Sequence, residues 1–384
     1  MTDVIRTTHV GSLPRSQRAV DLIFARERGE AFDRTVFEAT MAEEVVATVE
    51  RQIASGIDVV SDGETSKIGY ATYVKDRYTG FGGDSPRNAP ADLKQFPAYM
   101  ERIAQSGGTP KISRPCCIDE VRPRDHTDLE ADIRHLLAAL DKQQSPTGFM
   151  NAASPGVVAL FLPNRYYPNY ETYLSALSDA FRYEYQAITA AGLLLQIDCP
   201  DLALARHMIF ADKSDEEFVR IASMHVEALN AALEGIPEDR IRTHICWGNY
   251  EGPHICDIDM DQVFPVLMRT RSRYLLFETS NPRHAHEWTV FKSRKREIPD
   301  DKILVPGVID STTNFVEHPE LVRQRIERFV GIVGADRVMA GSDCGFGTFA
   351  GFGSVDPDIV YEKLRALSEG ARRVSGRPSM PPDV

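Results

Sequence analysis

Short apolar runs that each end in polar or small residues alternate with amphipathic stretches along all 384 residues of the chain. Four of the amphipathic stretches repeat apolar residues at intervals of three and four, which predicts helices over residues 37–54, 171–191, 215–233 and 319–333. The apolar runs predict eight strands, at residues 5–10, 57–62, 148–153, 193–198, 242–247, 274–279, 303–310 and 337–343. Eight strand and helix alternations favour a (β/α)₈ barrel, with a doubly wound parallel sheet as the alternative.

The segment between the second and third strands is too long for one loop and one helix. It contains Gly and Pro clusters, an apolar stretch at 112–121 and a helical pattern at 128–140. Long insertions in compact folds are usually functional. We therefore expect residues from about 80 to 146 to form an insertion, with a small hairpin or lid over the barrel mouth. The whole chain, 1–384, is predicted to be one catalytic barrel domain.

Composition and charge exclude several classes of protein. Lys and Arg number 44 against 56 Asp and Glu, the net charge is −12, and no basic block is present, so we expect no nucleic-acid partner. No apolar stretch reaches the length of about 18 residues that a membrane helix needs, and the N-terminus does not resemble a signal peptide. These features predict a cytoplasmic protein. Six cysteines are too sparse for a disulfide scaffold, which leaves core packing, metal binding or nucleophilic roles.

Polar side chains follow each predicted strand at its carboxyl end. In a barrel of this kind, the groups that do chemistry project from these ends into one cavity. The residues concerned, in chain order, are His9, Ser12, Asp62, Glu64, Asn151, Ser154, Asp198, His244, Cys246, Glu278, Asp310, Asp343 and Cys344.

Four of these residues together predict a metal site. His244 and Cys246 are two positions apart on one strand, so their side chains point the same way, and Glu278 and Cys344 end the sixth and eighth strands. One imidazole, two thiolates and one carboxylate match the ligand preferences of tetrahedral Zn²⁺. The alternative is a buried histidine beside two core cysteines.

Two other pairs have the same spacing as His244 and Cys246. They are His254 with Cys256 and His284 with His286, and both lie beyond the strand ends in loop-like sequence. We do not expect either pair to be the principal metal site.

Seven segments of the chain resemble the catalytic barrel of cobalamin-independent methionine synthase. They are TTHVGSLPR at the start, SDGE at 61–64, LQIDCPD at 195–201, HICWGN at 244–249, FETSNPR at 277–283, PGVID at 306–310 and GSDCGFG at 341–347. The resemblance implies a barrel that transfers an alkyl group, most simply a methyl group, to a thiol with the help of zinc. It also implies that His244, Cys246, Glu278 and Cys344 bind the metal, and that Ser12, Glu64 and Asp198 hold an amino-acid thiol.

The chemistry of a zinc-bound thiol agrees with this expectation. A free thiol has a pKa near 8.5, and zinc lowers that pKa so that the sulfur is a thiolate at neutral pH. Glu278 can act as a displaceable ligand, because catalytic zinc keeps one exchangeable position. Glu64 and Asp198 can bind a substrate ammonium group, unless they cap helices or pair with Arg165 and Arg206.

The chain departs from this family in three respects. Methionine synthases of the large type have two barrels, and this chain has one. Thr312 stands where the family has a proton-donating histidine, and Cys199 stands where it has a glutamate after the strand-four aspartate. His9 and Asp310 are the replacement acids we consider.

A second group of relatives, the epoxyalkane:coenzyme M transferases, fits these departures. They are also single barrels with an H-x-C pair and a distant cysteine, and they open an epoxide with a thiol. A sulfonate substrate needs cations, for which Arg15, Lys67, Lys75 and Arg77 are candidates.

The expected partners are therefore a small thiol and an alkyl donor, which is a methyl-folate, methylcobalamin or an epoxide. A homo-oligomer is compatible with the sequence. From other classes, a non-catalytic barrel that binds zinc or a thiol, or a decarboxylase-like relative, has the same fold, because function resides in the site.

Overall fold

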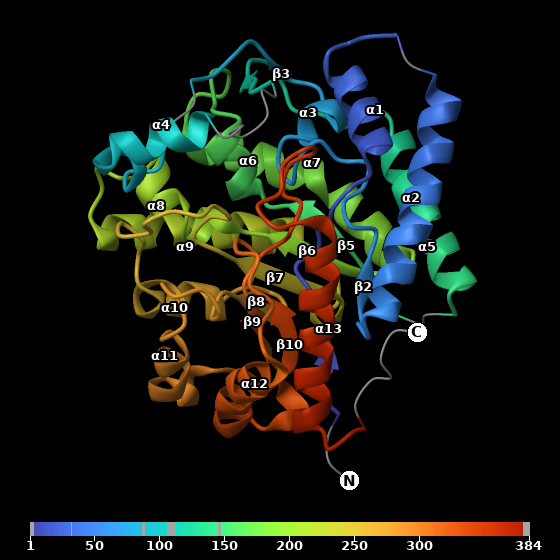
Figure 1. Ribbon diagram of the computed structural model, residues 1–384. Coiled ribbons are helices and arrows are strands. Elements are labelled where there is room, and N and C mark those ends of the chain that lie inside the picture. The colour runs from blue at the N-terminus through green and yellow to red at the C-terminus, as the bar shows by residue number, and fades with distance from the viewer. Residues whose placement is uncertain (1–3, 32, 87–88, 106–112, 145–146, 379–384) are drawn as a thin grey trace.

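All eight predicted strands are present in the computed structural model, which describes residues 4–31, 33–86, 89–105, 113–144 and 147–378 (Figure 1). Most of them agree with the predicted ranges to within a few residues. They are β1 (Arg6–Thr7), β2 (Val60–Ser61), β5 (Gly148–Ala153), β6 (Leu194–Asp198), β7 (Ile241–Ile245), β8 (Tyr274–Phe277), β9 (Ile303–Ile309) and β10 (Met339–Ser342).

These strands form one closed parallel sheet. Its order is β1-β10-β9-β8-β7-β6-β5-β2, and every pairing is parallel. The two ends of this order are joined, because the backbone N–H of Val59 donates to the C=O of Thr7 at 3.0 Å. Chain neighbours are therefore neighbours around a ring, as in the predicted (β/α)₈ barrel and unlike a doubly wound sheet.

The inside of the ring is packed with side chains. Arg242 of β7 is 2% exposed, and its guanidinium lies 3.7 Å from the centre of the Phe149 ring. It donates to the hydroxyl of Thr8 at 3.0 Å and to the C=O of His9 at 2.8 Å. A buried apolar cluster is formed by residues that lie in the strands or next to them. Its members are Val10, Val59, Phe149, Leu194, Leu276, Val305 and Met339. This packed layer is the floor beneath the functional site.

Helices cover the outside of the ring (Figure 1). The four predicted helices are confirmed as α2 (Arg34–Ala54), α7 (Tyr170–Ala190), α9 (Asp215–Ala232) and α12 (Pro319–Val333). Helix α9 begins at a capping box in which Ser214 and Glu217 satisfy each other's backbone N–H groups. The other helices are α1 (Gln17–Glu27), α3 (Val74–Arg77), α4 (Pro97–Gln105), α5 (Thr127–Lys142), α6 (Pro155–Phe161), α8 (Ala205–Met208), α10 (Met260–Met268), α11 (Trp288–Ser293) and α13 (Pro357–Val374). Within the described residues, no helix has both the length and the apolar character needed to span a bilayer.

The segment predicted as an insertion contains an antiparallel pair of short strands, β3 (Phe81–Gly82) and β4 (Cys116–Cys117). Residues 87–88, 106–112 and 145–146 of this segment, and with them the start of the apolar stretch at 112–121, lie outside the described residues. The carboxylate of Asp92 accepts hydrogen bonds from the Tyr250 hydroxyl and the His254 backbone N–H, both at 2.8 Å. These bonds tie the segment to the loop that follows β7, at the carboxyl end of the barrel.

Candidate metal centre

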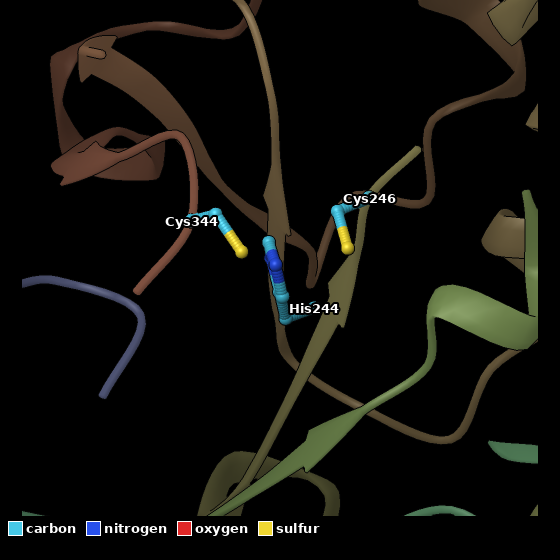
Figure 2. Close-up of side chains that lie close together, drawn as sticks. All are labelled: His244, Cys246 and Cys344. Atoms are coloured by element: carbon cyan, nitrogen blue, oxygen red, sulfur yellow. The ribbon is translucent and has the colours of Figure 1, made fainter. Parts of the chain in front are cut away.

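Three of the four predicted metal ligands converge. His244 is the next-to-last residue of β7, Cys246 directly follows that strand, and Cys344 follows β10. One ligand atom from each, a ring nitrogen or a sulfur, lies within 4.8 Å of the other two. Figure 2 shows the two sulfur atoms on either side of the His244 ring. The three side chains are buried, with exposed fractions of 2, 6 and 9%.

The chemistry of this cluster fits a divalent ion. Neither ring nitrogen of His244 makes a hydrogen bond of normal geometry with the described residues, and a buried polar atom without a partner costs about 1–3 kcal/mol. The Cys344 thiol, by hydrogen bonding, is the largest factor that lowers the pKa of Cys246 well below its usual range, and the charge of His244 acts in the same direction. These contacts favour the thiolate form of Cys246. An imidazole and two sulfurs are ligands that zinc prefers.

Glu278 does not join the three converging ligands. Its carboxylate accepts the backbone N–H of Trp247 at 3.1 Å and the side-chain amide of Asn281 at 2.7 Å, and these bonds hold it aside. Burial raises the pKa of Glu278 to about 8, and the negative charge of Cys246 adds to this effect. The cluster thus offers three side chains that could bind a metal, with a carboxylate nearby, and catalytic zinc sites also have three protein ligands and one position open to substrate.

A small cavity of about 50 Å³ lies against the metal cluster. Its lining includes all three predicted substrate residues, Ser12, Glu64 and Asp198, together with His244, Cys246 and Cys344. The structure therefore brings the predicted substrate residues and the converging metal ligands to one place.

The two carboxylates of the small cavity are buried, and neither forms an ion pair with the residues that the structure describes. One oxygen of Glu64 is buried with no hydrogen-bonding partner among the described residues. Burial raises the pKa of Glu64 to about 7, and burial also raises the pKa of Asp198. Arg206, one of the alternative partners suggested by the sequence, instead pairs with Asp215 at 2.8 Å. Burial therefore favours the neutral form of both carboxyl groups, and a cation that enters the cavity would favour the ionised form.

A wide cavity of about 450 Å³ adjoins the small one. It is lined in part by Glu278, Asp310, Thr312 and His254. Cys344 lines both cavities. The two cavities therefore adjoin at Cys344, beside Gly248 and Asn249, which also line both.

The two acids considered as proton donors have different surroundings. His9 is fully buried, its Nε2 lies 2.7 Å from the Gln52 side-chain oxygen, and its Nδ1 accepts the Gly11 N–H at 3.1 Å. Burial lowers the pKa of His9 to about 4. The ring is neutral, both nitrogens are in use, and it lines neither cavity. The structure thus does not bring His9 to the site, because Gln52 and Gly11 hold it beneath the cavities.

Asp310 does reach the wide cavity. Its two carboxylate oxygens accept the backbone N–H and the hydroxyl of both Thr312 and Thr313, at 2.6–3.0 Å. These four bonds occupy the acceptor positions of the carboxylate. Asp310 therefore shapes the turn that carries Thr312.

The four cations considered for a sulfonate are all engaged elsewhere. Lys67 and Arg77 are buried, and none of the four lines the small cavity. Arg15 and Lys67 donate to backbone carbonyls, whereas Lys75 and Arg77 pair with carboxylates. Arg15 donates to the C=O groups of Gly347 and Glu64, and Lys67 donates to the C=O of Asn151. Lys75 pairs with the carboxylates of Glu27 and Asp76, and Arg77 pairs with those of Asp132 and Glu184.

Two residues that line the small cavity had no role in the sequence analysis. Tyr70 lies in the long segment after β2, where no periodic pattern marks it. Asn249 belongs to the HICWGN segment, and its amide donates to the C=O of Gly345 at 2.7 Å and to the Thr348 hydroxyl at 2.6 Å. Asn249 thereby connects the loop after β7 with the loop that carries Cys344, and its place in a recognised motif was the available signal.

The chain has relatives of similar length throughout. The methionine synthase of Saccharolobus solfataricus is 22% identical over 375 residues, which cover 97% of this chain and 95% of that protein. The resemblance to the methionine synthase family is confirmed. The 2-hydroxypropyl-CoM lyase of Xanthobacter autotrophicus is 25% identical over 402 residues, which cover 96% of this chain and 95% of the lyase. No protein-family model matches the chain.

Solved structures of methionine synthases have the same fold. A B12-independent methionine synthase from Shewanella sp. W3-18-1, in complex with selenomethionine, superposes with a TM-score of 0.71 at 19% identity and covers 97% of this chain and 98% of its own. A putative vitamin-B12-independent methionine synthase from Listeria monocytogenes gives 0.66 at 18% identity, with coverage of 97% and 99%. At these identities the comparison confirms the barrel.

Proposed function

We propose that this protein is an enzyme that transfers an alkyl group, most simply a methyl group, to the thiol of a small amino acid such as homocysteine. The observation that carries the proposal is the convergence of His244, Cys246 and Cys344 within 4.8 Å, beside a cavity lined by Glu64 and Asp198. The methionine synthase and 2-hydroxypropyl-CoM lyase relatives support it, since both names denote enzymes that act on thiol compounds.

The three converging residues are the groups that would hold zinc. When bound, the ion supplies charge that lowers the pKa of a substrate thiol, so that the sulfur becomes a nucleophile at neutral pH. The structure supports this assignment through the unpaired ring nitrogens of His244 and the lowered pKa of Cys246. Two cysteine thiolates balance the charge of a divalent ion, which favours electron density on an incoming sulfur.

Glu64 and Asp198 are proposed to bind the ammonium group of the substrate. Their carboxylates are buried and form no ion pair with the described residues, and burial raises the pKa of both although the charge of Lys67 opposes it. A bound ammonium group reverses this situation, because an opposite charge stabilises the ionised carboxylate. Ser12 lies beside them, with its hydroxyl oriented by the backbone N–H of Gly347 at 3.4 Å. These contacts would place the substrate sulfur at the metal cluster.

The wide cavity is proposed to receive the alkyl donor. It shares Cys344 with the small cavity, so an electrophilic carbon in the wide cavity would face a sulfur at the metal. Glu278 lies at this boundary and is held by Trp247 and Asn281. We propose that it moves to the fourth ligand position when no thiol is present.

Epoxide opening by a thiol is the second candidate function. The relationship with the 2-hydroxypropyl-CoM lyase favours it. Against a sulfonate-bearing thiol, the four candidate cations donate to other groups, and the small cavity contains two carboxylates. We therefore place the amino-acid thiol first. The cytoplasmic location, the single-domain organisation and a homo-oligomer stay predictions.

A competition experiment tests the proposed function. The zinc-loaded protein is offered L-homocysteine or coenzyme M, each with methyltetrahydrofolate, methylcobalamin or a small epoxide, and the thioether product is identified by mass spectrometry. We expect a product from homocysteine and none from coenzyme M. Glu64→Gln is expected to weaken homocysteine binding at least tenfold, whereas the exposed Glu50→Gln leaves it unchanged. A product formed only from the epoxide assigns the second function, a methylated product from coenzyme M but not from homocysteine contradicts the amino-acid thiol, and no thioether from any pair contradicts both functions.

A further inference from the structure

A second group of metal-binding side chains lies outside the proposed zinc centre. His254 and Asp257 are in the loop after β7, and His284 is in the loop after β8. One ligand atom from each lies within 4.8 Å of the other two. The ring atoms His254 Nδ1 and His284 Nε2 are each 2.9 Å from the same carboxylate oxygen, Oδ2 of Asp257.

The structure does not place both members of either suggested pair, His254 with Cys256 or His284 with His286, in this cluster. Cys256 accepts a hydrogen bond from the Gln95 amide at 3.2 Å, and His286 is exposed. The partner of His254 is instead three residues away, at Asp257, and the partner of Asp257 in the next loop is His284. Neither partner could be derived from the i and i+2 spacing.

The hydrogen bonds of His254 direct its Nδ1 toward the carboxylate of Asp257. Its Nε2 lies 3.1 Å from the C=O of Tyr250, to which it must donate a proton. Burial lowers the pKa of both rings, but hydrogen bonding to Asp257 outweighs it and raises the pKa of His254 and that of His284, the latter to about 10, so without an ion a proton occupies each 2.9 Å contact. A divalent ion would replace these protons between the two ring nitrogens and the carboxylate. A hydrogen bond from the far ring nitrogen to a carbonyl is also typical of metal-ligating histidines.

Unpartnered polar atoms gather at the same place. Oδ1 of Asp257, Nδ1 of His284 and Nδ1 of His207 make no hydrogen bond of normal geometry with the described residues. The side chains of Asp257, His284 and His207 are only 1–3% exposed. His207 Nδ1 is 3.2 Å from Asp257 Oδ1, and the carboxylate of Glu287 is 3.5 Å from His284 Nδ1. These outer groups can orient the carboxylate and the ring of His284.

We propose that His254, Asp257 and His284 form a second site for a divalent transition-metal ion, with zinc as the first candidate. Its ligands are two imidazole nitrogens and a carboxylate oxygen, so it differs from the sulfur-rich zinc centre and requires no thiol substrate. The ion would join the loop after β7 to the loop after β8, which lie close only in the folded barrel.

This second site is connected to the first through Trp247. The Trp247 ring stacks on His284 with centres 4.1 Å apart, and its backbone N–H donates to Glu278 at 3.1 Å. Trp247 is also the next residue after Cys246. The second ion thus positions the loop that carries Cys246, and it binds without taking part in alkyl transfer.

Metal stoichiometry in an untagged protein tests this proposal independently of the proposed function. In a Cys246→Ser/Cys344→Ser variant the sulfur site is removed, and we expect about one zinc per chain to remain after desalting, against about two in the unaltered protein. X-ray absorption at the zinc edge of this variant is expected to show imidazole and oxygen ligands and no sulfur. Adding His284→Gln is expected to remove the remaining zinc, whereas adding His286→Gln, as a matched control in the same loop, retains it.

Two results would overturn the second site. One is a double-cysteine variant that holds no zinc, which assigns the cluster to proton-filled hydrogen bonds. The other is retention of zinc by the variant that also carries His284→Gln, with circular dichroism showing a native spectrum. If the His284→Gln variant does not fold, the absorption spectrum of the double-cysteine variant decides alone through the presence of imidazole ligands. Loss of alkyl transfer in any variant does not bear on this outcome.

Discussion

Replacing Glu64 with glutamine is predicted to stabilise the substrate-free protein at alkaline pH. Burial raises the pKa of Glu64 from 4.5 to about 7. A carboxyl group with a raised pKa in the folded state is less stable ionised there than in the unfolded chain, so it lowers stability above pH 7 and has little effect below pH 4.5. At about 1.4 kcal/mol per pH unit, the difference between 4.5 and about 7 corresponds to about 3 kcal/mol.

Chemical denaturation of the metal-free protein measures this effect. We expect Glu64→Gln to raise the free energy of unfolding by about 3 kcal/mol at pH 8.5 and by about 1 kcal/mol or less near pH 5. The control Glu50→Gln changes an exposed side chain on α2 and should alter stability by less than about 0.5 kcal/mol at both values. A Glu64→Gln variant that is less stable at pH 8.5, or an effect that does not vary with pH, would refute the reasoning. Glu64→Gln is thus expected both to stabilise the protein and to weaken substrate binding, because selection for function can retain a buried charge that lowers stability.

Four further substitutions address other parts of the molecule. Cys246→Ser and Cys344→Ser, singly, should each remove the zinc of the sulfur site and abolish thioether formation, as measured by metal analysis and mass spectrometry. Gly345→Ala should raise KM for the thiol several-fold with a smaller effect on kcat in steady-state assays, because a Cβ there would lie 2.0 Å from the Ser12 hydroxyl oxygen; an unchanged KM argues against Ser12 in the thiol site. Arg77→Met leaves two buried carboxylates unpaired and should lower the free energy of unfolding by about 3–5 kcal/mol without changing metal content; a loss below 1 kcal/mol in denaturation contradicts this.

The barrel could be predicted from the sequence because each strand is an apolar run that ends at a polar residue. The first two strands were the least well predicted, since residues 5–10 and 57–62 contain only the short strands β1 and β2. The reason is a side chain: the carboxylate of Asp58 accepts the backbone N–H of Thr7 at 2.8 Å, where a regular ladder would use a backbone carbonyl. Periodicity in the sequence does not reveal such a replacement.

The metal cluster was predictable for a similar reason, and its surroundings were not. His244, Cys246 and Cys344 lie at strand ends, and the closed ring brings these ends together. The position of Glu278 depends on bonds to Trp247 and Asn281, which no spacing rule specifies.

The cluster of His254, Asp257 and His284 could not be predicted from the sequence. It joins residues of two loops, and loop contacts depend on how the loops cross the barrel mouth rather than on the register of the strands.

Zinc-edge X-ray absorption of the protein loaded with one equivalent of zinc, with and without L-homocysteine, tests the central claim most directly. The sulfur-containing site should bind this zinc first, because zinc prefers thiolate ligands to the imidazole and carboxylate ligands of His254, Asp257 and His284. We predict two sulfur ligands and one imidazole in the absence of the thiol, and one additional sulfur when homocysteine is bound. A spectrum without protein sulfur, or a sulfur count that does not change with homocysteine, would contradict the proposal that this barrel activates a thiol at zinc.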